Sequence, residues 1–208
     1  MTPEDDSRAH AARLESLWQG QFGDSYTTRN ASAAEGRLPF WKELTSSIQV
    51  GSVLEVGCNL GANLRWLAEL LPPHQVYGVD INHSALAEVR RVLPTVNAVW
   101  AKARELPFRD RFFDLVYTTG VLIHQAPDAV EDVMREIVRC SNRYVLAGEY
   151  YAETLTEVPY RGEEGSLYKM DFGATYLEKF PELTLVKKGF LPRGSGWDDL
   201  TFWLLERR

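Results

Sequence analysis

Residues 53–64 read VLEVGCNLGANL, an apolar run that stops at Gly57 and is followed, after Gly61, by leucines at helical spacing. This order predicts a strand, a tight turn and a helix. Because neither glycine carries a Cβ atom, the backbone of the turn can bend sharply and let a ligand lie on the main chain. Open α/β sheets bind ligands at the carboxyl ends of their parallel strands, so we expect a ligand site at this turn.

A carboxylate ends the next apolar run. Residues 78–82 read GVDIN, and Asp80 can accept hydrogen bonds from both hydroxyls of a ribose. The dinucleotide fingerprint G-x-G-x-x-G is incomplete, because Asn59 and Ala62 occupy its second and third glycine positions. These residues favour a nucleotide-like ligand, although a βαβ unit with an ordinary glycine turn would also explain the first stretch.

Length and composition indicate one soluble globular domain. The chain has 208 residues, of which 45% are hydrophobic and 25% charged, and its formal net charge is −6. One domain over residues 1–208 is the simplest organisation. The acidic balance argues against a broad basic surface for nucleic acid and favours a small-molecule acceptor as the partner. The oligomeric state stays open between monomer and homodimer.

Neither targeting nor metal signals are evident in the sequence. The N-terminal residues are acidic and polar, and no apolar run approaches the roughly 18 residues of a membrane span, so we expect a cytoplasmic protein that does not bind membranes. Cys58 and Cys140 are far apart and lack the C-x-x-C spacing of zinc sites. We expect both to be reduced, buried thiols and no metal to be bound.

From residue 53 onward, short apolar runs alternate with amphipathic stretches, which is typical of βαβ units in a mostly parallel sheet. The expected strands are 52–57, 75–80, 96–100, 113–119 and 143–149, and the expected helices are 61–71, 83–93 and 127–139. Pro72 and Pro73 should end the first helix, and Asn82 should cap the second. Residues 183–186 and 200–205 read as two further strands, which we expect to form an antiparallel pair at one end of the sheet.

The residues before the first strand predict two helices, over 3–18 and 33–48. Between them we expect a loop at 20–24 and a polar, aromatic segment at 25–30. We interpret residues 1–48 as a helical lid segment over the site. The alternative is a packing helix with a solvated loop, which the residues by themselves favour.

A third motif lies in residues 103–116, which read ARELPFRDRFFDLV. Together with the glycine turn and Asp80, in this order and spacing, the run resembles class I S-adenosylmethionine (SAM)-dependent methyltransferases. The resemblance implies a Rossmann-like α/β fold, a mostly parallel seven-stranded sheet with an antiparallel C-terminal hairpin, and SAM as cofactor without a metal. It implies a cofactor site that contains Glu55, Gly57, Cys58, Asn59, Gly61, Asp80, Ile81, Lys102 and Ala103.

Lys102 departs from that pattern. Many relatives have there a polar or acidic side chain that accepts a hydrogen bond from the adenine amino group, and Lys has no acceptor atom. We therefore expect the backbone around Ala103 to contact the adenine.

Longer segments resemble a narrower family, the pseudaminic acid biosynthesis-associated methylases. The similar segments cover nearly the whole chain and are residues 18–30, 120–124, 139–144, 148–151, 158–162, 168–172, 189–190 and 198–203. This resemblance implies a small SAM-dependent methyltransferase of bacterial sugar or secondary metabolism. Residues 192–197 differ from the more acidic, histidine-bearing stretch of these relatives, which favours a changed acceptor.

Candidate catalytic groups follow the fourth and fifth strands. Thr118, Thr119 and Gly120 end the fourth strand, where freed carbonyls can hold the ammonium group of the methionine moiety. His124 lies one turn further and suits proton removal, although a structural histidine is frequent there in this fold. Beyond the fifth strand, a carboxylate and two phenols should face the same crevice and act in catalysis or substrate binding: Glu149, Tyr150 and Tyr151. We expect His10, His74 and His83 at the surface.

Further candidates come from the lid segment and from the residues after the fifth strand. We expect Trp18 and Phe22 to anchor the lid, Trp18 also to contact the cofactor, and Tyr26 and Arg29 to lie near the methionine carboxylate. Tyr160, Arg161 and Lys169 would suit an anionic acceptor. The alternative is that the last two form surface ion pairs with Glu163, Glu164 or Asp171.

The leading hypothesis is methyl transfer from SAM to a hydroxyl, amine or carboxylate of a small polar molecule, largely by positioning. Two alternatives remain at this point. A nucleotide-dependent oxidoreductase would need the complete dinucleotide fingerprint. A non-catalytic SAM-binding partner subunit would keep the cofactor motifs and lose the polar groups near the methyl group.

Overall fold

The central element is a seven-stranded sheet in the order β3-β2-β1-β4-β5-β9-β8. The structure is a computed structural model that describes residues 3–29 and 35–208, with side chains from residue 6. The strands are β1 (Val53–Val56), β2 (Val76–Asp80), β3 (Asn97–Trp100), β4 (Phe113–Thr119), β5 (Ser141–Glu149), β8 (Leu183–Leu191) and β9 (Leu200–Arg207). Only β9 runs antiparallel to its neighbours β5 and β8. The predicted Rossmann-like α/β fold with a C-terminal antiparallel hairpin is confirmed.

Strand register places the carboxyl ends of the central strands along one edge. Val53 in β1 pairs with Val76 in β2 and with Leu115 in β4, all in parallel. The four residues of β1 are buried, as expected for a strand covered on both faces. The glycine turn, Asp80 and Thr119 therefore lie side by side at this edge.

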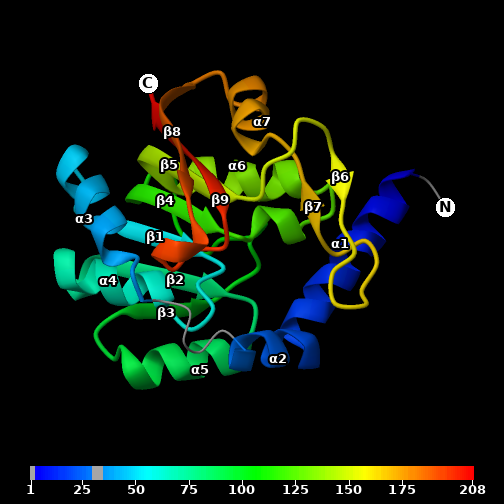
Figure 1. The fold of residues 1–208 in the computed structure, drawn as a ribbon, viewed down its shortest axis with the longest axis horizontal. Helices are drawn as coiled ribbons and strands as arrows, with labels where there is room; N and C mark the ends of the chain where they lie inside the picture. The colour runs from blue at the N-terminus through cyan, green and yellow to red at the C-terminus, as the bar shows by residue number, and fades with distance from the viewer. Residues whose placement is uncertain (1–2, 30–34) are drawn as a thin grey trace.

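Helices cover both faces of the sheet (Figure 1). On one face, α3 (Leu38–Ser47), α4 (Ala62–Leu70) and α5 (His83–Val92) pack against a core that includes Leu115 and Tyr117. On the other, α6 (Val130–Cys140) and α7 (Phe172–Lys179) pack against a core that includes Leu54 and Val116. The side chain of Asn82 caps α5 by accepting from the amide of Ala85 at 2.8 Å, as predicted.

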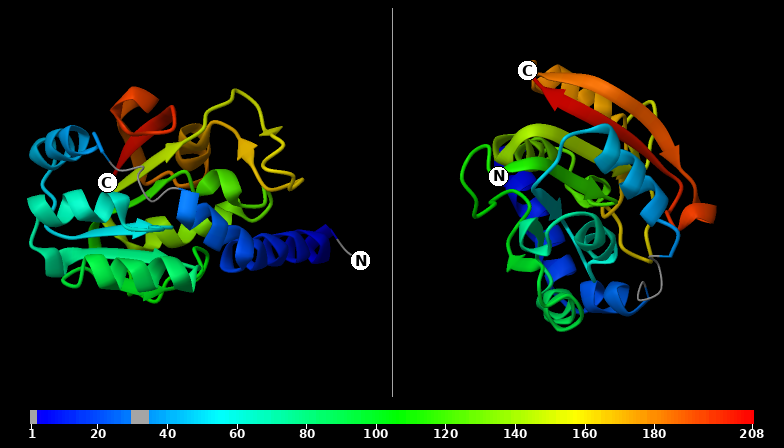
Figure 2. Two further views of the ribbon diagram at one scale, coloured as in Figure 1. Left: turned by 60° about the horizontal axis from the view of Figure 1, so that its bottom comes forward. Right: turned by 90° about the vertical axis from the view of Figure 1, so that its left-hand side faces the viewer.

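The lid segment consists of helices in its described part. α1 (Pro3–Gln19) and α2 (Gln21–Arg29) lie across the carboxyl edge of the sheet (Figure 2). The predicted loop at 20–24 is wrong, because Gln21 to Asp24 belong to α2. Gly23 makes this corner: a Cβ atom there would lie 1.9 Å from the carbonyl oxygen of Trp18. Glycine therefore marks close packing of two helices here.

Other boundaries shift or were missed. The helix expected over 33–48 begins at Leu38, after Gly36 in a left-handed conformation, and residues 30–34 lie outside the described part. Helix α7 and a small antiparallel pair, β6 (Thr156–Glu157) and β7 (Tyr168–Lys169), were not predicted from the sequence. Cys58 and Cys140 are buried free thiols, as predicted. Within the described residues, no helix combines the length and apolar character needed to cross a membrane.

The long connection between β5 and α7 reaches back to the lid. Arg13 in α1 donates to the carbonyl oxygens of Glu164 and Gly165 at 2.9 and 2.8 Å, and the His10 ring bonds to the Gly165 carbonyl at 2.8 Å. In Figure 1 this connection, with β6 and β7, lies beside α1. The carboxyl edge is thus enclosed by the lid and by residues 150–171.

Candidate functional site

A cavity of about 120 Å³, partly open to solvent, lies between the lid helices and the carboxyl edge of the sheet. Its walls include nine residues that the sequence analysis assigned to cofactor binding: Trp18, Tyr26, Gly57, Asn59, Asp80, Ile81, Ala103, Thr119 and Gly120. His124 also lines it.

The glycine turn forms the floor. Gly57 has a φ of +76°, and a Cβ atom there would lie 2.5 Å from the Val121 side chain, so only glycine fits. The amides of Gly57 and Cys58 donate to the carbonyl of Val79 at 2.8 and 2.9 Å. Gly61 (φ +73°) leads into α4. Backbone hydrogen bonds to β2 therefore shape the turn independently of a ligand.

Asp80 is held rigidly at the end of β2. One carboxylate oxygen accepts from the amide of Asn59 at 2.7 Å and the other from the amide of Asn82 at 2.8 Å. Burial raises the pKa of Asp80, and these amide hydrogen bonds oppose that rise. Each oxygen keeps a further lone pair, so Asp80 can still accept from two ligand hydroxyls.

A buried polar network lies behind the floor. The Asn63 amide donates to Glu55 Oε1 at 2.6 Å and to Thr119 Oγ1 at 3.1 Å, and its carbonyl accepts from Arg37 at 3.1 Å. Glu55 is 2% exposed, and burial raises its pKa to about 7. Within the described residues, Glu55 Oε2 and the buried Tyr117 hydroxyl each lack a hydrogen bond of ordinary geometry, but the two groups lie close enough to interact. Opposite charges are thus joined through one amide, beside a tyrosine hydroxyl that can donate to the remaining Glu55 oxygen.

Arg37 is a residue that the sequence analysis missed. Its Nε donates to the carbonyl of Gly196 at 2.7 Å, and its guanidinium lies over the ring of Trp197 at 4.5 Å. Burial lowers its pKa, and no carboxylate of the described residues lies within 4.0 Å of it. An arginine between a glycine and a helix has no pattern that signals such burial.

Aromatic rings connect the lid to the sheet. The ring of Trp18 lies 5.2 Å from those of Phe22 and Tyr26 and 4.5 Å from that of His124. Burial raises the pKa of Tyr26 well above its usual value. Arg29, by contrast, is exposed at the end of α2 and does not line the cavity. The expectation that Arg29 points to the cofactor is therefore not met.

His124 is oriented by a single hydrogen bond. Its Nδ1 lies 2.7 Å from the carbonyl oxygen of Ser166, and because a carbonyl only accepts, Nδ1 carries the hydrogen. The Nε2 lone pair has no partner among the described residues. The ring packs between Trp18 and Tyr160, and burial lowers its pKa to about 4. His124 is thus a neutral imidazole with an available acceptor nitrogen.

The expectation that Glu149 faces the cavity is not met. Its side chain is completely buried, and it accepts from the amides of Val121 and Ile123 at 3.0 and 3.4 Å. Burial raises its pKa to about 7. The carboxylate therefore holds the turn between Gly120 and His124 in shape, because the strand alternation turns its side chain under this turn.

Tyr150 and Tyr151, the two residues after β5, direct their side chains to different sides. Tyr150 is half-buried. Burial raises its pKa to about 12, and the nearby Asp198 and Tyr160 side chains add to this rise. Tyr151 is 41% exposed and lies toward Trp203 and Lys188, so the expectation that it faces the site is not met. Successive side chains of an extended segment point to opposite sides.

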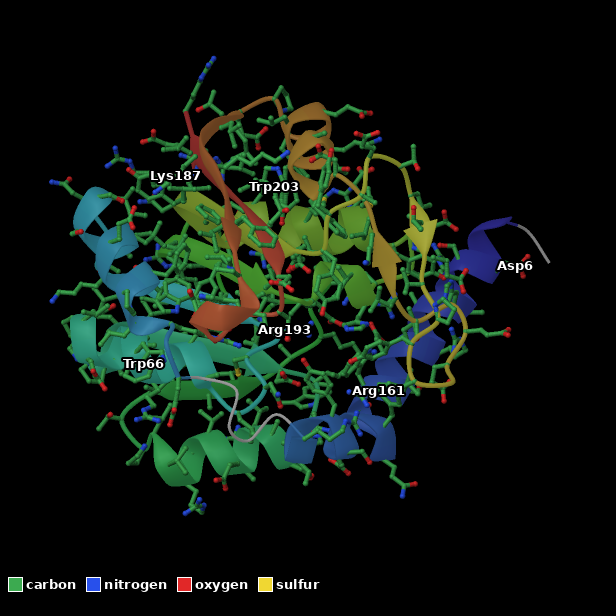
Figure 3. The ribbon with its side chains drawn as sticks, in the orientation of Figure 1. Asp6, Trp66, Arg161, Lys187, Arg193 and Trp203 are labelled. Atoms are coloured by element: carbon green, nitrogen blue, oxygen red, sulfur yellow. The ribbon has the colours of Figure 1, made fainter. Side chains whose placement is uncertain are left out.

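Arg161 and Lys169 lie over tyrosine rings, at 5.7 Å from Tyr160 and 5.3 Å from Tyr150 respectively. In the described part of the chain, neither forms an ion pair within 4.0 Å, including with the acidic neighbours considered above. Figure 3 shows Arg161 beside α2 and Arg193 at the connection between β8 and β9.

The remaining predicted cofactor residues surround the cavity without lining it. Thr118 and Cys58 are buried, and Lys102 is turned toward Glu15 of α1, with 2.9 Å between Nζ and Oε2. Glu15 itself lines the cavity and was missed by the sequence analysis. Within the described residues, no group of three or more His, Cys, Asp or Glu could hold a metal ion.

The chain has detectable relatives by sequence. A methyltransferase domain family matches residues 53–143. An uncharacterized protein of Haemophilus influenzae is 32% identical over 93 residues, covering 42% of this chain and 37% of that protein. The phthiotriol/phenolphthiotriol dimycocerosates methyltransferase 1 of Mycobacterium ulcerans is 38% identical over 66 residues, covering 31% of this chain and 24% of that protein. The chain thus spans well under half the length of these relatives.

Solved structures share the fold. The 1,6-didemethyltoxoflavin-N1-methyltransferase of Burkholderia thailandensis, with S-adenosylhomocysteine (SAH) bound, aligns over 100% of this chain and 91% of its own with a TM-score of 0.68 at 15% identity. A SAM-dependent methyltransferase of Mesorhizobium loti aligns over 80% and 97% with a TM-score of 0.60 at 16% identity. Residues 53–143 therefore match a methyltransferase domain family, and the chain shares its fold with solved SAM-dependent methyltransferases.

Proposed function

We propose that the chain is a SAM-dependent methyltransferase that transfers a methyl group to an oxygen or nitrogen atom of a small, polar, anionic metabolite or sugar. The observation that carries this proposal is the cavity at the carboxyl edge of the sheet, which combines the glycine turn, Asp80 and His124. The family match supports methyl transfer. The resemblance to pseudaminic acid biosynthesis-associated methylases supports a sugar or related metabolite as acceptor.

The polar groups of the site suit SAM. Asp80 would accept from the ribose hydroxyls, and the glycine turn gives room for the chain that leads to sulfur. Arg37 and Glu55 offer opposite buried charges joined through Asn63, which complement the carboxylate and ammonium of an amino acid. In this proposal Arg37, which like Glu55 and Asn63 lies behind the residues that line the cavity, takes the role expected of Arg29. Glu55 Oε2, which has the Tyr117 hydroxyl as its neighbour, would accept from the ammonium group.

His124 is the group best placed to accept a proton. SAM, when bound, supplies a methyl group on a positively charged sulfur atom. In the proposed reaction, Nε2 of His124 would accept the proton that the acceptor atom releases on methylation. The ring stays neutral above a pH of about 4, so Nε2 keeps its lone pair over the neutral range, and the same burial makes this imidazole a weaker base than an exposed histidine. Glu149 holds the turn that positions this ring.

An anionic acceptor fits the cations of residues 150–171. Arg161 and Lys169 lie over the rings of Tyr160 and Tyr150, and no ion pair of the described residues uses them. Tyr160 also touches His124, so these cations lie near the proposed base. Arg161→Ala should raise the acceptor KM about tenfold or more while leaving SAH affinity unchanged. An unchanged KM would leave the charge of the acceptor open.

Two measurements test the proposed function. Calorimetry should detect SAH binding, and labelled SAM offered with acidic sugars and carboxylated metabolites should yield a labelled product. His124→Asn should then lower kcat by roughly 10²–10⁴-fold with SAH affinity unchanged. His83→Asn, at an exposed histidine, serves as the matched control. Absence of SAH binding would refute the proposal, and an unchanged kcat in His124→Asn would remove the base role.

A further inference from the structure

We propose that Glu15 of helix α1 recognises the adenine amino group of the cofactor, in compensation for the lysine that occupies position 102. This inference rests on the proposed function, because it requires SAM or SAH in the cavity. It assigns to the lid helix a part in base recognition that the strand loop cannot perform, since Lys102 has no acceptor atom.

Glu15 is held in place by two cations from the loop after β3. Its Oε2 lies 2.9 Å from Lys102 Nζ, and its Oε1 lies 2.6 Å from Arg104 Nε. A second guanidinium nitrogen of Arg104 donates to Oε2 at 3.1 Å. The Glu15 side chain is only 17% exposed. The carboxylate is therefore oriented before any ligand arrives, at the place where α1 meets this loop.

The position of Asp80 decides which end of the cavity receives the base. With the ribose on Asp80, one end leads to Thr119, Gly120 and His124, where the polar groups for methyl transfer gather. The other end lies beside the carboxyl ends of β2 and β3 and is bounded by apolar residues suited to a flat ring: Ile81, Ala101 and Ala103. Glu15 lies among these. Among the described lining residues, Asp80 and Glu15 are the two carboxylates. With Asp80 at the ribose, Glu15 is the carboxylate that remains to contact the adenine.

The chemistry of the carboxylate suits an amino group. A carboxylate has about four acceptor positions, and the three contacts with Lys102 and Arg104 leave one. An amino group at C6 of the purine can donate to it. A carbonyl oxygen at C6 would instead place an acceptor against an acceptor, and sites built around one hydrogen bond reject such analogues strongly.

A purely structural ion pair would have a different effect on ligand binding. If Glu15 only holds α1 against the loop, it contributes little to the binding free energy, as partly exposed ion pairs do, and it affects the affinity for every nucleoside equally. The two readings therefore differ in base preference, which binding experiments can measure.

Calorimetry with SAH and S-inosylhomocysteine, which has a carbonyl oxygen at C6, distinguishes them. The wild-type protein should bind SAH at least about tenfold more tightly, the scale of one hydrogen bond to a charged group. Glu15→Met should lose most of this preference through weaker SAH binding. Glu15→Gln, whose amide can donate to a carbonyl, should reduce the preference for SAH by raising the affinity for S-inosylhomocysteine. The control Glu131→Met, at an ion-paired glutamate on α6, should change the affinity for neither ligand.

The outcomes separate this inference from the proposed function. Equal losses for both ligands in the Glu15 variants, with the preference intact, would overturn base recognition and leave an ion pair that fastens the lid. Lys102→Met adds an independent readout, since it removes the cation and keeps the carboxylate, so the preference for SAH should persist. If the wild-type protein binds neither ligand, the proposed function itself fails. Glu15→Gln decides the question if Glu15→Met does not fold.

Discussion

Individual buried charges set the properties of the cavity floor. Asp80 is stabilised by two backbone amides, whereas Glu55 accepts from Asn63 and keeps one oxygen without a hydrogen bond of ordinary geometry. An unsatisfied buried acceptor costs about 1–3 kcal/mol, which a ligand donor would recover. Both residues are therefore expected to contribute more to ligand binding than to folding.

Asp80→Ala should weaken SAH binding by about 1.5–3 kcal/mol, the scale of hydrogen bonds to a charged acceptor. The loss follows from removal of the ribose acceptor and of the bonds to Asn59 and Asn82. Calorimetry measures it, and Asp132→Ala, at an exposed ion pair, is the control. Unchanged affinity in Asp80→Ala would disprove this placement of the ribose.

The affinity for SAH should fall as the pH drops below about 7, because protonation of Glu55 removes the charge that holds the ligand ammonium. The raised pKa acts in the opposite sense on stability: its contribution is full below the usual glutamate pKa and is lost as the pH rises through about 7. Glu55→Gln should flatten the affinity profile between pH 5 and 8 on the scale of roughly tenfold per unit. A wild-type slope that persists in this variant would assign the titration to another group.

At the scale of elements, the lid is attached through close backbone contacts and aromatic rings. α2 turns against α1 at Gly23, and Asn82 of the α5 cap donates to the Trp18 carbonyl at 3.3 Å and to Asp24 at 3.0 Å. The lid therefore contacts Asn82, which lies two residues after Asp80. The placement of the lid is thus coupled to the proposed ribose subsite.

Gly23→Ala should displace α2 and lower SAH affinity, because the new methyl group would lie 1.9 Å from the Trp18 carbonyl and 2.9 Å from Asn82 Nδ2. Overpacking of this kind costs about 1–3 kcal/mol, so affinity should fall roughly tenfold or more. Gly194→Ala is the control, since its Cβ atom would meet no atom within 4 Å. Calorimetry on both variants tests this. Equal affinities would show that the lid does not depend on this corner.

At the scale of the molecule, two cores stabilise the sheet on its two faces, and the site lies at the edge where both cores end. α7 closes one core next to the antiparallel strands. Gly173 in α7 packs directly on Trp203 of β9, with 2.1 Å between a Cβ atom built there and the indole ring. Fold stability and site geometry can therefore be changed separately.

Gly173→Ala should lower the free energy of unfolding by about 1–3 kcal/mol, because the clash with buried Trp203 outweighs the gain in helix propensity of roughly 1 kcal/mol. SAH affinity should stay unchanged in the folded variant, as Gly173 lies away from the cavity. Urea unfolding measures the first and calorimetry the second. Gly194→Ala, with no atom within 4 Å of the new methyl group, should leave stability unchanged. A Gly173 variant as stable as the wild type would contradict this packing.

Local patterns by themselves determined the sheet and the cofactor floor. Apolar runs, the glycine turn and Asp80 specify strand, bend and carboxylate within a few residues, and Asn82 caps α5 through its own neighbours. Such features depend on backbone geometry and on contacts close in sequence, so they can be predicted from sequence alone.

Only the tertiary structure decided which distant side chains complete the site. Arg37 meets Asn63 and Gly196, and Glu15 meets Lys102 and Arg104, across separations that periodicity does not address. The sequence equally did not show that Glu149 turns under the loop or that Arg29 stays in solvent. The physical reason is that packing of the lid and of residues 150–171 onto the sheet edge selects these contacts, and that packing depends on the whole chain.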